Sequence, residues 1–351
     1  MKNLIDKLNL QKKLSHAEWV RLIEGYSPEI AEYAAAAADK IRREIFGTDV
    51  YIRGLIEISN YCKNNCLYCG IQNSNRALAR YRLTEDEILN CCREGFRLGF
   101  RTFVMQGGED AYFTDEVLCR IIGRIKSEFP ECAVTLSLGE RSRESYQMLF
   151  DAGADRYLLR HETADKEHYN YLHNGKMSFE NRMECLKNLK KIGFQTGCGF
   201  MVGSPHQTAE CLAKDMEFIC AFKPQMVGIG PFVSHHATVF ANEKNGSVDL
   251  TLFLLSLVRI MHPKVLMPAT TALAALSHDG RERGIKSGAN VVMPNLSPLK
   301  DRKKYALYDN KPSTDAEAAE GLSELKERME KAGYRVVVTR GDFCECVNAS
   351  V

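Results

Sequence analysis

Short apolar runs alternate with longer amphipathic segments along most of this chain. Eight of the runs have the length and composition of buried parallel strands, and glycine or proline lies at most of their ends. They are GLIEIS (54–59), TFVMQ (102–106), AVTLSL (133–138), RYLLR (156–160), TGCGFM (196–201), MVGIG (226–230), VLMPA (265–269) and NVVMP (290–294).

Helix signals fill the intervals between these runs. Thr84 and Glu87 form a capping-box pattern, which predicts a helix that ends near Gly99. Further helices are expected to begin near Asp115, Ser142, Ser178, Thr208, Asp249 and Asp279. Eight strands alternating with helices predict an α/β fold, a complete (β/α)8 TIM-type barrel. An open, doubly wound sheet is the alternative, although such sheets usually contain fewer strands.

The two ends of the chain are expected to be extensions of one barrel. Residues 1–50 are predicted to form an N-terminal helical extension, most clearly over 28–47. Residues 51–308 would form the barrel. Residues 309–351 would form a short C-terminal extension packed on it, with a helix-prone part followed by a late strand near 334–340.

Composition and charge narrow the class of protein. The 351 residues are 45% hydrophobic and 26% charged, which is typical of a globular protein. A net charge of +2 is too small to indicate the excess of positive charge that is typical of nucleic-acid-binding proteins. The amino terminus lacks the apolar core of a secretion signal, and no apolar run approaches the roughly 20 residues that span a bilayer. We therefore expect a cytoplasmic protein that binds neither nucleic acid nor membrane.

The chain contains 13 cysteines, an odd number that argues against a disulfide framework in a chain without a secretion signal. Cys62, Cys66 and Cys69 follow the first predicted strand with Cys-x3-Cys-x2-Cys spacing. Three thiolates on one short loop can ligate three irons of a cubane and leave the fourth iron free to bind a small molecule. Structural zinc usually requires four protein ligands, and an electron-carrying cluster usually has a fourth cysteine, so both are weaker alternatives.

This cysteine motif followed by a barrel resembles the radical S-adenosylmethionine (radical SAM) superfamily. The resemblance implies one 4Fe–4S cluster on Cys62, Cys66 and Cys69, which would cleave S-adenosylmethionine to methionine and a 5′-deoxyadenosyl radical. It also implies a reduced ferredoxin or flavodoxin as electron donor. The residues assigned to S-adenosylmethionine are Tyr68, Gly107, Gly108, Glu109, Ser137, Glu162 and Arg182. For the glycine segment, a tight turn alone is the alternative.

A narrower resemblance comes from a set of strings. YLLRHETAD (157–165), SFENR (178–182), MVGIGPF (226–232), ANEK (241–244), MPATTAL (267–273) and GANVVMPN (288–295) are together similar to the HydE family of FeFe-hydrogenase maturases. That similarity implies a small-molecule substrate, a cysteine-derived iron complex carrying carbon monoxide and cyanide, and other hydrogenase maturation proteins as partners. Its substrate cavity would be lined by Thr135, Arg160, Thr270, Thr271, Met293 and Tyr305, with Tyr308 as an alternative for the last.

Alternative functions remain at this point. Biotin synthase and methylornithine synthase share the barrel and the cysteine motif, and would act on an amino acid or a small carboxylate. A non-catalytic zinc-binding protein is an alternative of another class. Some relatives hold a second cluster on three cysteines after the eighth strand, but residues 309–333 contain none, so we predict a single cluster. Whether Cys344 and Cys346 bind any metal stays open.

Overall fold

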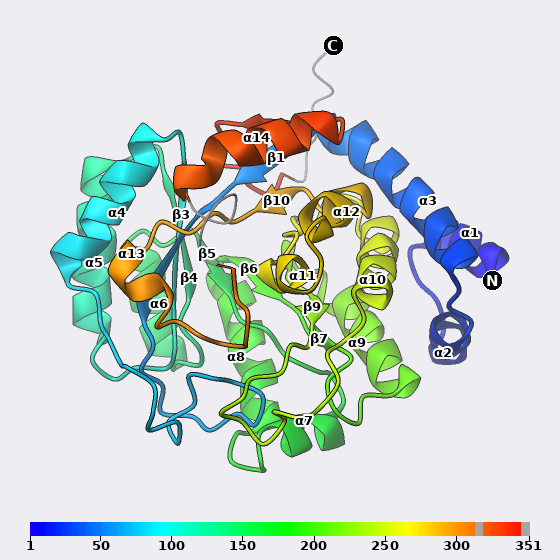
Figure 1. Ribbon diagram of the computed structural model, residues 1–351, viewed down its shortest axis with the longest axis horizontal. Coiled ribbons are helices and arrows are strands. Elements are labelled where there is room, and N and C mark those ends of the chain that lie inside the picture. The colour runs from blue at the N-terminus through cyan, green and yellow to red at the C-terminus, as the bar shows by residue number, and fades with distance from the viewer. Residues whose placement is uncertain (313–318, 345–351) are drawn as a thin grey trace.

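Parallel strands surrounded by helices form the centre of the molecule (Figure 1). The computed structural model describes residues 1–312 and 319–344. Six strands make one parallel ladder in the order β2-β3-β4-β5-β6-β8. Their bounds are β2 Gly54–Ser59, β3 Thr102–Gly107, β4 Ala133–Ser137, β5 Arg156–Leu158, β6 Gln195–Cys198 and β8 Met226–Val227. Each coincides with one of the apolar runs, so the predicted α/β fold with parallel strands is confirmed.

Isolated parallel bridges, rather than a regular ladder, connect the two edges of this sheet. Residues 265–269, expected as a strand, instead contribute the bridges Met226–Leu266 and Pro268–Val291. Proline lacks the N–H that a ladder needs, which explains the interruption at Pro268. The next strand, β10 (Val291–Val292), leads to the bridge Leu55–Asn295 on β2. The eight segments are therefore arranged as in a TIM-type barrel, but without a continuous ladder.

Two expected strands are each divided in two. TGCGFM forms β6 and then β7 (Met201–Val202), and MVGIG forms β8 and then β9 (Gly230–Pro231). The division lies where Gly199 and Gly228 approach each other, because a Cβ on Gly199 would be 1.9 Å from the carbonyl oxygen of Gly228. Beyond this point β7 and β9 form their own parallel pair at the carboxyl end of the barrel.

The seven helices predicted between the strands begin within one residue of the expected positions, whereas the helices Lys166–Leu172, Thr271–Leu276 and Leu299–Arg302 were not predicted. Thr84 and Glu87 form the expected capping box, in which the Glu87 N–H donates to Thr84 Oγ1 over 3.2 Å and the Thr84 N–H donates to Glu87 Oε2 over 2.9 Å. The helices around the strands are α4 Glu85–Arg97, α5 Asp115–Glu128, α6 Arg143–Asp151, α7 Lys166–Leu172, α8 Phe179–Ile192, α9 Ala209–Phe222, α10 Val248–Met261, α11 Thr271–Leu276, α12 Gly280–Lys286 and α13 Leu299–Arg302.

A small second sheet ties the two ends of the chain to the barrel. It has the order β10-β1-β11, with β1 at Asp49–Ile52 and β11 at Arg335–Val337. The strand β1 spans the expected boundary between residues 50 and 51. The remaining elements are α1 Lys2–Gln11, α2 His16–Glu24, α3 Pro28–Phe46, the 3-10 turn Ala319–Gly321 and α14 Leu322–Lys331.

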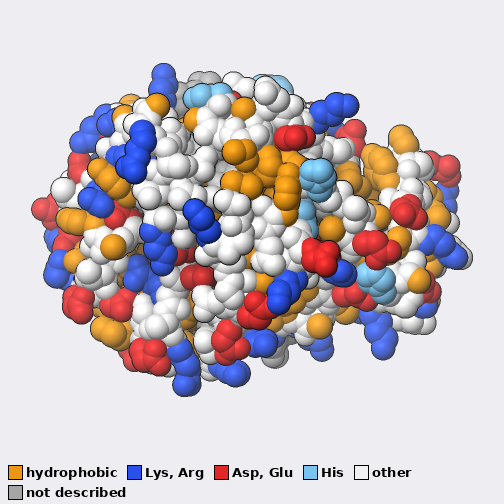
Figure 2. All heavy atoms as spheres, turned by 90° about the horizontal axis from the view of Figure 1, so that it is seen from below, with side chains coloured by type: hydrophobic (Ala, Val, Ile, Leu, Met, Phe, Trp, Pro, Cys, Tyr) orange, Lys and Arg blue, Asp and Glu red, His pale blue; other side chains and the backbone are white. Residues whose placement is uncertain are grey.

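The described part of the chain contains no helix with the length and apolarity that a membrane crossing requires. On the face shown in Figure 2, lysine and arginine side chains alternate with aspartate and glutamate, and no basic stripe stands out.

Candidate active site at the carboxyl end of the barrel

The cysteine loop leaves β2 and turns over the carboxyl end of the barrel. Cys62, Cys66 and Cys69 are all half-buried and free of disulfides. The Lys63 N–H donates to the Glu109 carbonyl over 3.0 Å, and the Gly70 N–H donates to the Leu307 carbonyl over 2.8 Å, so neighbouring segments hold both ends of the loop. Burial raises the pKa of the Cys69 thiol to about 12. Ligation therefore requires a strongly charged metal centre to displace the thiol protons.

The spacing of the three thiols suits a cluster better than a single metal ion. Ligands of one tetrahedral zinc lie roughly 3.8 Å apart for Zn–S bonds of about 2.3 Å. Within residues 1–312 and 319–344, the one group of three or more such ligand atoms that all lie within 4.8 Å of each other is His235, His236 and Asp309. At least one pair of the cysteine sulfurs is thus more than 4.8 Å apart. A cubane places each thiolate on a different iron, so its ligands lie farther apart than those of one zinc ion.

The glycine segment at the end of β3 packs directly against the cysteine loop. A Cβ on Gly108 would lie 2.2 Å from the Tyr61 carbonyl oxygen and 2.7 Å from Cys62 Cβ, so only glycine allows this approach. Glu109 Oε1 accepts the Glu140 N–H over 3.0 Å, and Glu109 Oε2 pairs with Lys63 over 3.0 Å. These contacts fix the carboxylate beside the cluster loop.

Charged residues at the end of β5 face the same space. Arg160 Nη2 lies 3.0 Å from Glu162 Oε2, and Glu162 adopts a left-handed backbone with φ 65°. Such a conformation is costly for glutamate and is often found at functional sites. Arg182 of α8 is buried and reaches the strand end, where its Nε donates to Glu140 Oε1 over 2.6 Å. The strand end thus presents an arginine and a carboxylate to the cavity.

His161, between these residues, points away from the cavity. Its Nε2 lies 3.2 Å from Asp215 of α9, and its Nδ1 accepts the Gly199 N–H over 3.3 Å. Burial, followed by the charges of Arg160 and Arg182, lowers the pKa of His161 well below its usual value. Arg160 and Glu162 therefore line the cavity, whereas His161 is buried against α9 and does not line it.

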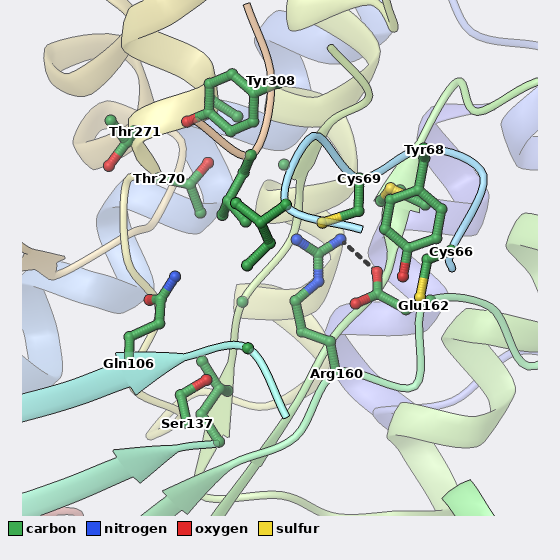
Figure 3. Close-up of a pocket in the computed structure, with 18 of the residues that line it drawn as sticks. Cys66, Tyr68, Cys69, Gln106, Ser137, Arg160, Glu162, Thr270, Thr271 and Tyr308 are labelled. Atoms are coloured by element: carbon green, nitrogen blue, oxygen red, sulfur yellow. Dashed lines mark ion pairs between the residues drawn. The ribbon is translucent and has the colours of Figure 1, made fainter. Parts of the chain in front are cut away.

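One cavity of about 350 Å³ brings most of the predicted site residues together. Figure 3 shows Cys66, Cys69, Tyr68 and Glu162 on one side, Thr270, Thr271 and Tyr308 on the other, and Arg160 between them. The predicted residues on its wall are Cys62, Cys66, Tyr68, Cys69, Gly107, Gly108, Glu109, Ser137, Arg160, Glu162, Arg182, Thr270, Thr271, Met293 and Tyr305. Thr135 is not on this wall; it is buried, and its hydroxyl has no hydrogen-bond partner among the described residues.

Four further polar residues on the cavity wall were missed from the sequence: Glu57, Asn64, Gln106 and Lys311. Glu57 had a recognisable signal, because it is the single charge inside an otherwise apolar strand run. Lys311 had none, since it follows the last predicted barrel strand in a polar segment. His235 is buried at 2% exposure beside Gly70, whereas its neighbour His236 is exposed. Cys346 lies outside the described residues.

Comparison with known proteins identifies the family. Residues 56–219 match the family model for the Radical SAM superfamily. The chain is 47% identical over 274 residues to the [FeFe] hydrogenase maturase subunit HydE of Thermotoga maritima, which covers 78% of each protein. The chain belongs to the radical SAM superfamily. It is a radical SAM enzyme similar to HydE, and its cofactors are the 4Fe–4S cluster and S-adenosylmethionine of that family, so the non-catalytic zinc-binding alternative is set aside.

Other relatives agree with this membership. The chain is 28% identical over 299 residues to 3-methylornithine synthase of Methanosarcina acetivorans, covering 85% of this chain and 84% of the relative. A crystal structure of methylornithine synthase (PylB) matches with a TM-score of 0.84 and 27% identity, over 95% of this chain and 97% of that one. The maturase HydG matches with a TM-score of 0.79 at 18% identity, over 96% and 75%, which supports the fold alone.

Proposed function

We propose that this radical SAM enzyme is a FeFe-hydrogenase maturase of the HydE type. Its substrate would be a cysteine-derived iron complex carrying carbon monoxide and cyanide, on the way to the hydrogenase active site. The observation that carries the proposal is the 47% identity to HydE over 78% of both chains. The cavity supports it, since a volume of about 350 Å³ beside the cysteine loop admits a small molecule rather than a polymer.

Cys62, Cys66 and Cys69 would hold the cluster, and a set of polar residues around it would bind S-adenosylmethionine. Once bound and reduced, the cluster supplies the electron that splits S-adenosylmethionine into methionine and a 5′-deoxyadenosyl radical. Glu109 and Glu162 offer carboxylates to the amino group, while Arg182 offers a planar donor to a carboxylate. The proposed cofactor residues are Tyr68, Gly107, Gly108, Glu109, Ser137, Glu162 and Arg182.

The opposite wall would hold the substrate. Arg160 stands between the two walls, so its guanidinium can touch both ligands. Thr270 Oγ1 is buried without a hydrogen-bond partner in the described structure and lies on the cavity wall, where a ligand would satisfy it. The proposed substrate residues are Thr135, Arg160, Thr270, Thr271, Met293 and Tyr305. For Thr135 the proposal rests on resemblance, since its side chain is not on the cavity wall.

We further propose one functional unit from the three segments 1–50, 51–308 and 309–351, because the sheet β10-β1-β11 joins all three. A reduced ferredoxin or flavodoxin would donate electrons in the cytoplasm, and other hydrogenase maturation proteins would supply the substrate and take the product. A single cluster per chain remains our prediction.

A methylornithine-synthase-like reaction on an amino acid is the second candidate. The match of a solved methylornithine synthase over nearly the whole chain favours it. The two candidates share the cluster and S-adenosylmethionine and differ in substrate. Formation of 3-methylornithine from an amino acid by the purified enzyme would establish the second candidate and contradict the first.

The central test is anaerobic reconstitution followed by reduction with S-adenosylmethionine. Wild type should bind about four irons per chain and form 5′-deoxyadenosine, whereas Cys66→Ala should lose both, because two remaining thiolates cannot hold the cluster. Cys119→Ala is the matched control, since Cys119 lies on α5 away from the cavity. Rescue of hydrogenase activity in a strain that lacks its own maturase tests the substrate. Wild-type levels of 5′-deoxyadenosine in Cys66→Ala would refute the proposal.

A further inference from the structure

A buried ion pair lies in the wall of the cavity, and neither of its residues belongs to the proposed cofactor or substrate residues. Glu57 of β2 is fully buried, and its Oε2 accepts the Asn295 Nδ2–H over 2.9 Å. Its other oxygen, Oε1, accepts a hydrogen bond from Lys311 Nζ. The Lys311 side chain is only 9% exposed, and both Glu57 and Lys311 line the cavity. The Lys311 ammonium group and its Glu57 carboxylate partner therefore both lie at the cavity wall.

Lys311 reaches the cavity from a segment that belongs to no barrel strand. This segment, residues 303–312, is called the strap here; in Figure 1 it is the orange-red coil that crosses the middle of the barrel. Asn60 Nδ2 donates to the Lys304 carbonyl over 2.7 Å, and the Asp309 N–H donates to the Ser234 carbonyl over 3.0 Å. The strap is thus hydrogen-bonded to the cysteine loop and to the loop after β9. Lys311, at the end of the strap, lines the cavity.

A buried ion pair of this kind contributes little to the stability of the fold. Removing both charges from water costs free energy that their attraction rarely recovers, and apolar side chains of the same volume often serve as well. A lysine ammonium offers three N–H donors. Among the described residues, Glu57 and the Tyr305 carbonyl, 3.0 Å away, accept two of them. A donor therefore remains for a ligand in the cavity.

Arg160, another cation on the cavity wall, has a similar arrangement. Arg160 is paired with Glu162, yet its buried Nε has no hydrogen-bond partner in the described structure. Each cation keeps its own carboxylate, so the cavity offers hydrogen-bond donors to an anion without accumulating net charge. A ligand with a negatively charged group satisfies these donors, whereas a neutral or purely cationic ligand leaves them unpaired.

We propose that Lys311 is a substrate-binding residue that donates a hydrogen bond to an anionic group of the substrate, in the class of an amino-acid carboxylate. Glu57 and Asn295 are positioning residues that hold its ammonium at the cavity wall. This inference rests on the proposed function, in which the substrate is derived from cysteine, and it adds a residue that selects for the charged form of that substrate.

Isothermal titration of the reconstituted enzyme with S-adenosylmethionine present tests the proposal. The two probes are S-methyl-L-cysteine and its amide, which differ in the carboxylate alone. Wild type should bind the acid about tenfold more tightly than the amide, as expected for a hydrogen bond to a charged group. Lys311→Met should abolish this preference, and Lys311→Arg should keep most of it because the charge remains. Glu57→Gln should weaken the preference by releasing the ammonium.

Lys303→Met is the matched control, because Lys303 is an exposed lysine of the same strap and does not line the cavity. It should retain the full preference. Equal iron content in Lys311→Met and wild type shows that the cysteine loop is intact. Failure of wild type to bind the acid, an equal affinity for acid and amide, or a full preference in Lys311→Met would each overturn the proposal. Failure of the proposed function is distinguishable, since wild type would then fail to restore hydrogenase activity in a strain that lacks its own maturase, whatever the titration shows.

Discussion

A Cβ atom at position 108 would lie 2.2 Å from the Tyr61 carbonyl oxygen, whereas a Cβ at position 107 would have 3.4 Å to its nearest neighbours. Adjacent glycines thus have different roles. Gly108 permits the β3 loop to pack against the backbone of the cysteine loop, and Gly107 has room for a methyl group. The geometry of the cluster loop therefore depends on a missing side chain at one position.

Gly108→Ala should displace the cysteine loop, because the obstructing atoms belong to backbone and to Cys62 rather than to a flexible side chain. A misplacement of about 1 Å at a reacting centre can reduce the rate roughly 100-fold. The measurement is the rate of 5′-deoxyadenosine formation per bound cluster. Gly123→Ala is the control, since a Cβ there meets nothing within 4 Å, and it should keep the wild-type rate. An unchanged rate in Gly108→Ala would contradict this account.

At the scale of elements, His16 of α2 forms hydrogen bonds with two glutamates of the barrel helix α9. His16 Nδ1 lies 2.9 Å from Glu217, and Nε2 lies 2.5 Å from Glu210. Hydrogen bonds with Glu217 and then Glu210 raise the pKa of His16 above its usual value. A raised pKa in the folded state means that the folded protein binds the proton more tightly than the unfolded chain does.

The contribution of His16 to stability should therefore depend on pH. It is fully present below the unfolded pKa of about 6.5 and is lost as the pH rises through the raised folded value. Melting temperatures of wild type and His16→Gln should differ at about pH 5.5 and converge at about pH 9. His278→Gln, which changes an exposed histidine outside these helices, should track wild type at both values. A difference that grows with pH would disprove the assignment.

At the scale of the whole molecule, the segment after β11 covers the amino-terminal end of the barrel. Arg156 of β5 is fully buried and donates to Asp342 over 2.5 Å and to the Arg340 carbonyl over 2.9 Å. Burial alone would raise the pKa of Asp342, but Arg340 and Arg156 lower it to about 2. This ion pair connects the last described segment to the centre of the sheet.

Asp342→Asn should leave the buried Arg156 charge without its partner. The expected loss in free energy of unfolding is roughly 2 kcal/mol, less than for a fully buried pair because Asp342 is partly exposed. A lowered folded pKa contributes stability above the unfolded value of about 3.9, and this is lost as the pH falls toward 2. Urea unfolding at neutral and acid pH measures it. Asp86→Asn, which breaks an exposed pair with Arg124, should change stability little.

Much of the fold was predictable from local pattern. Strand runs, helix caps such as Thr84, and the cysteine spacing depend on residues a few positions apart, so the sequence displays them directly. Where local chemistry opposed the pattern, the prediction needed correction: Pro268 interrupted an expected strand, and the Gly199–Gly228 contact divided two others.

The order of the strands, most of the helices, the cysteine triad and the family of the chain all follow from residue patterns in the sequence. Which side chains meet is set by the packing of the whole chain. Glu57 and Lys311 are 254 positions apart, and β1 pairs with β10 and β11 from the far end of the chain. The physical reason is that hydrophobic periodicity specifies which face of an element is buried but not its neighbours. Contacts between distant residues follow from how the whole chain packs.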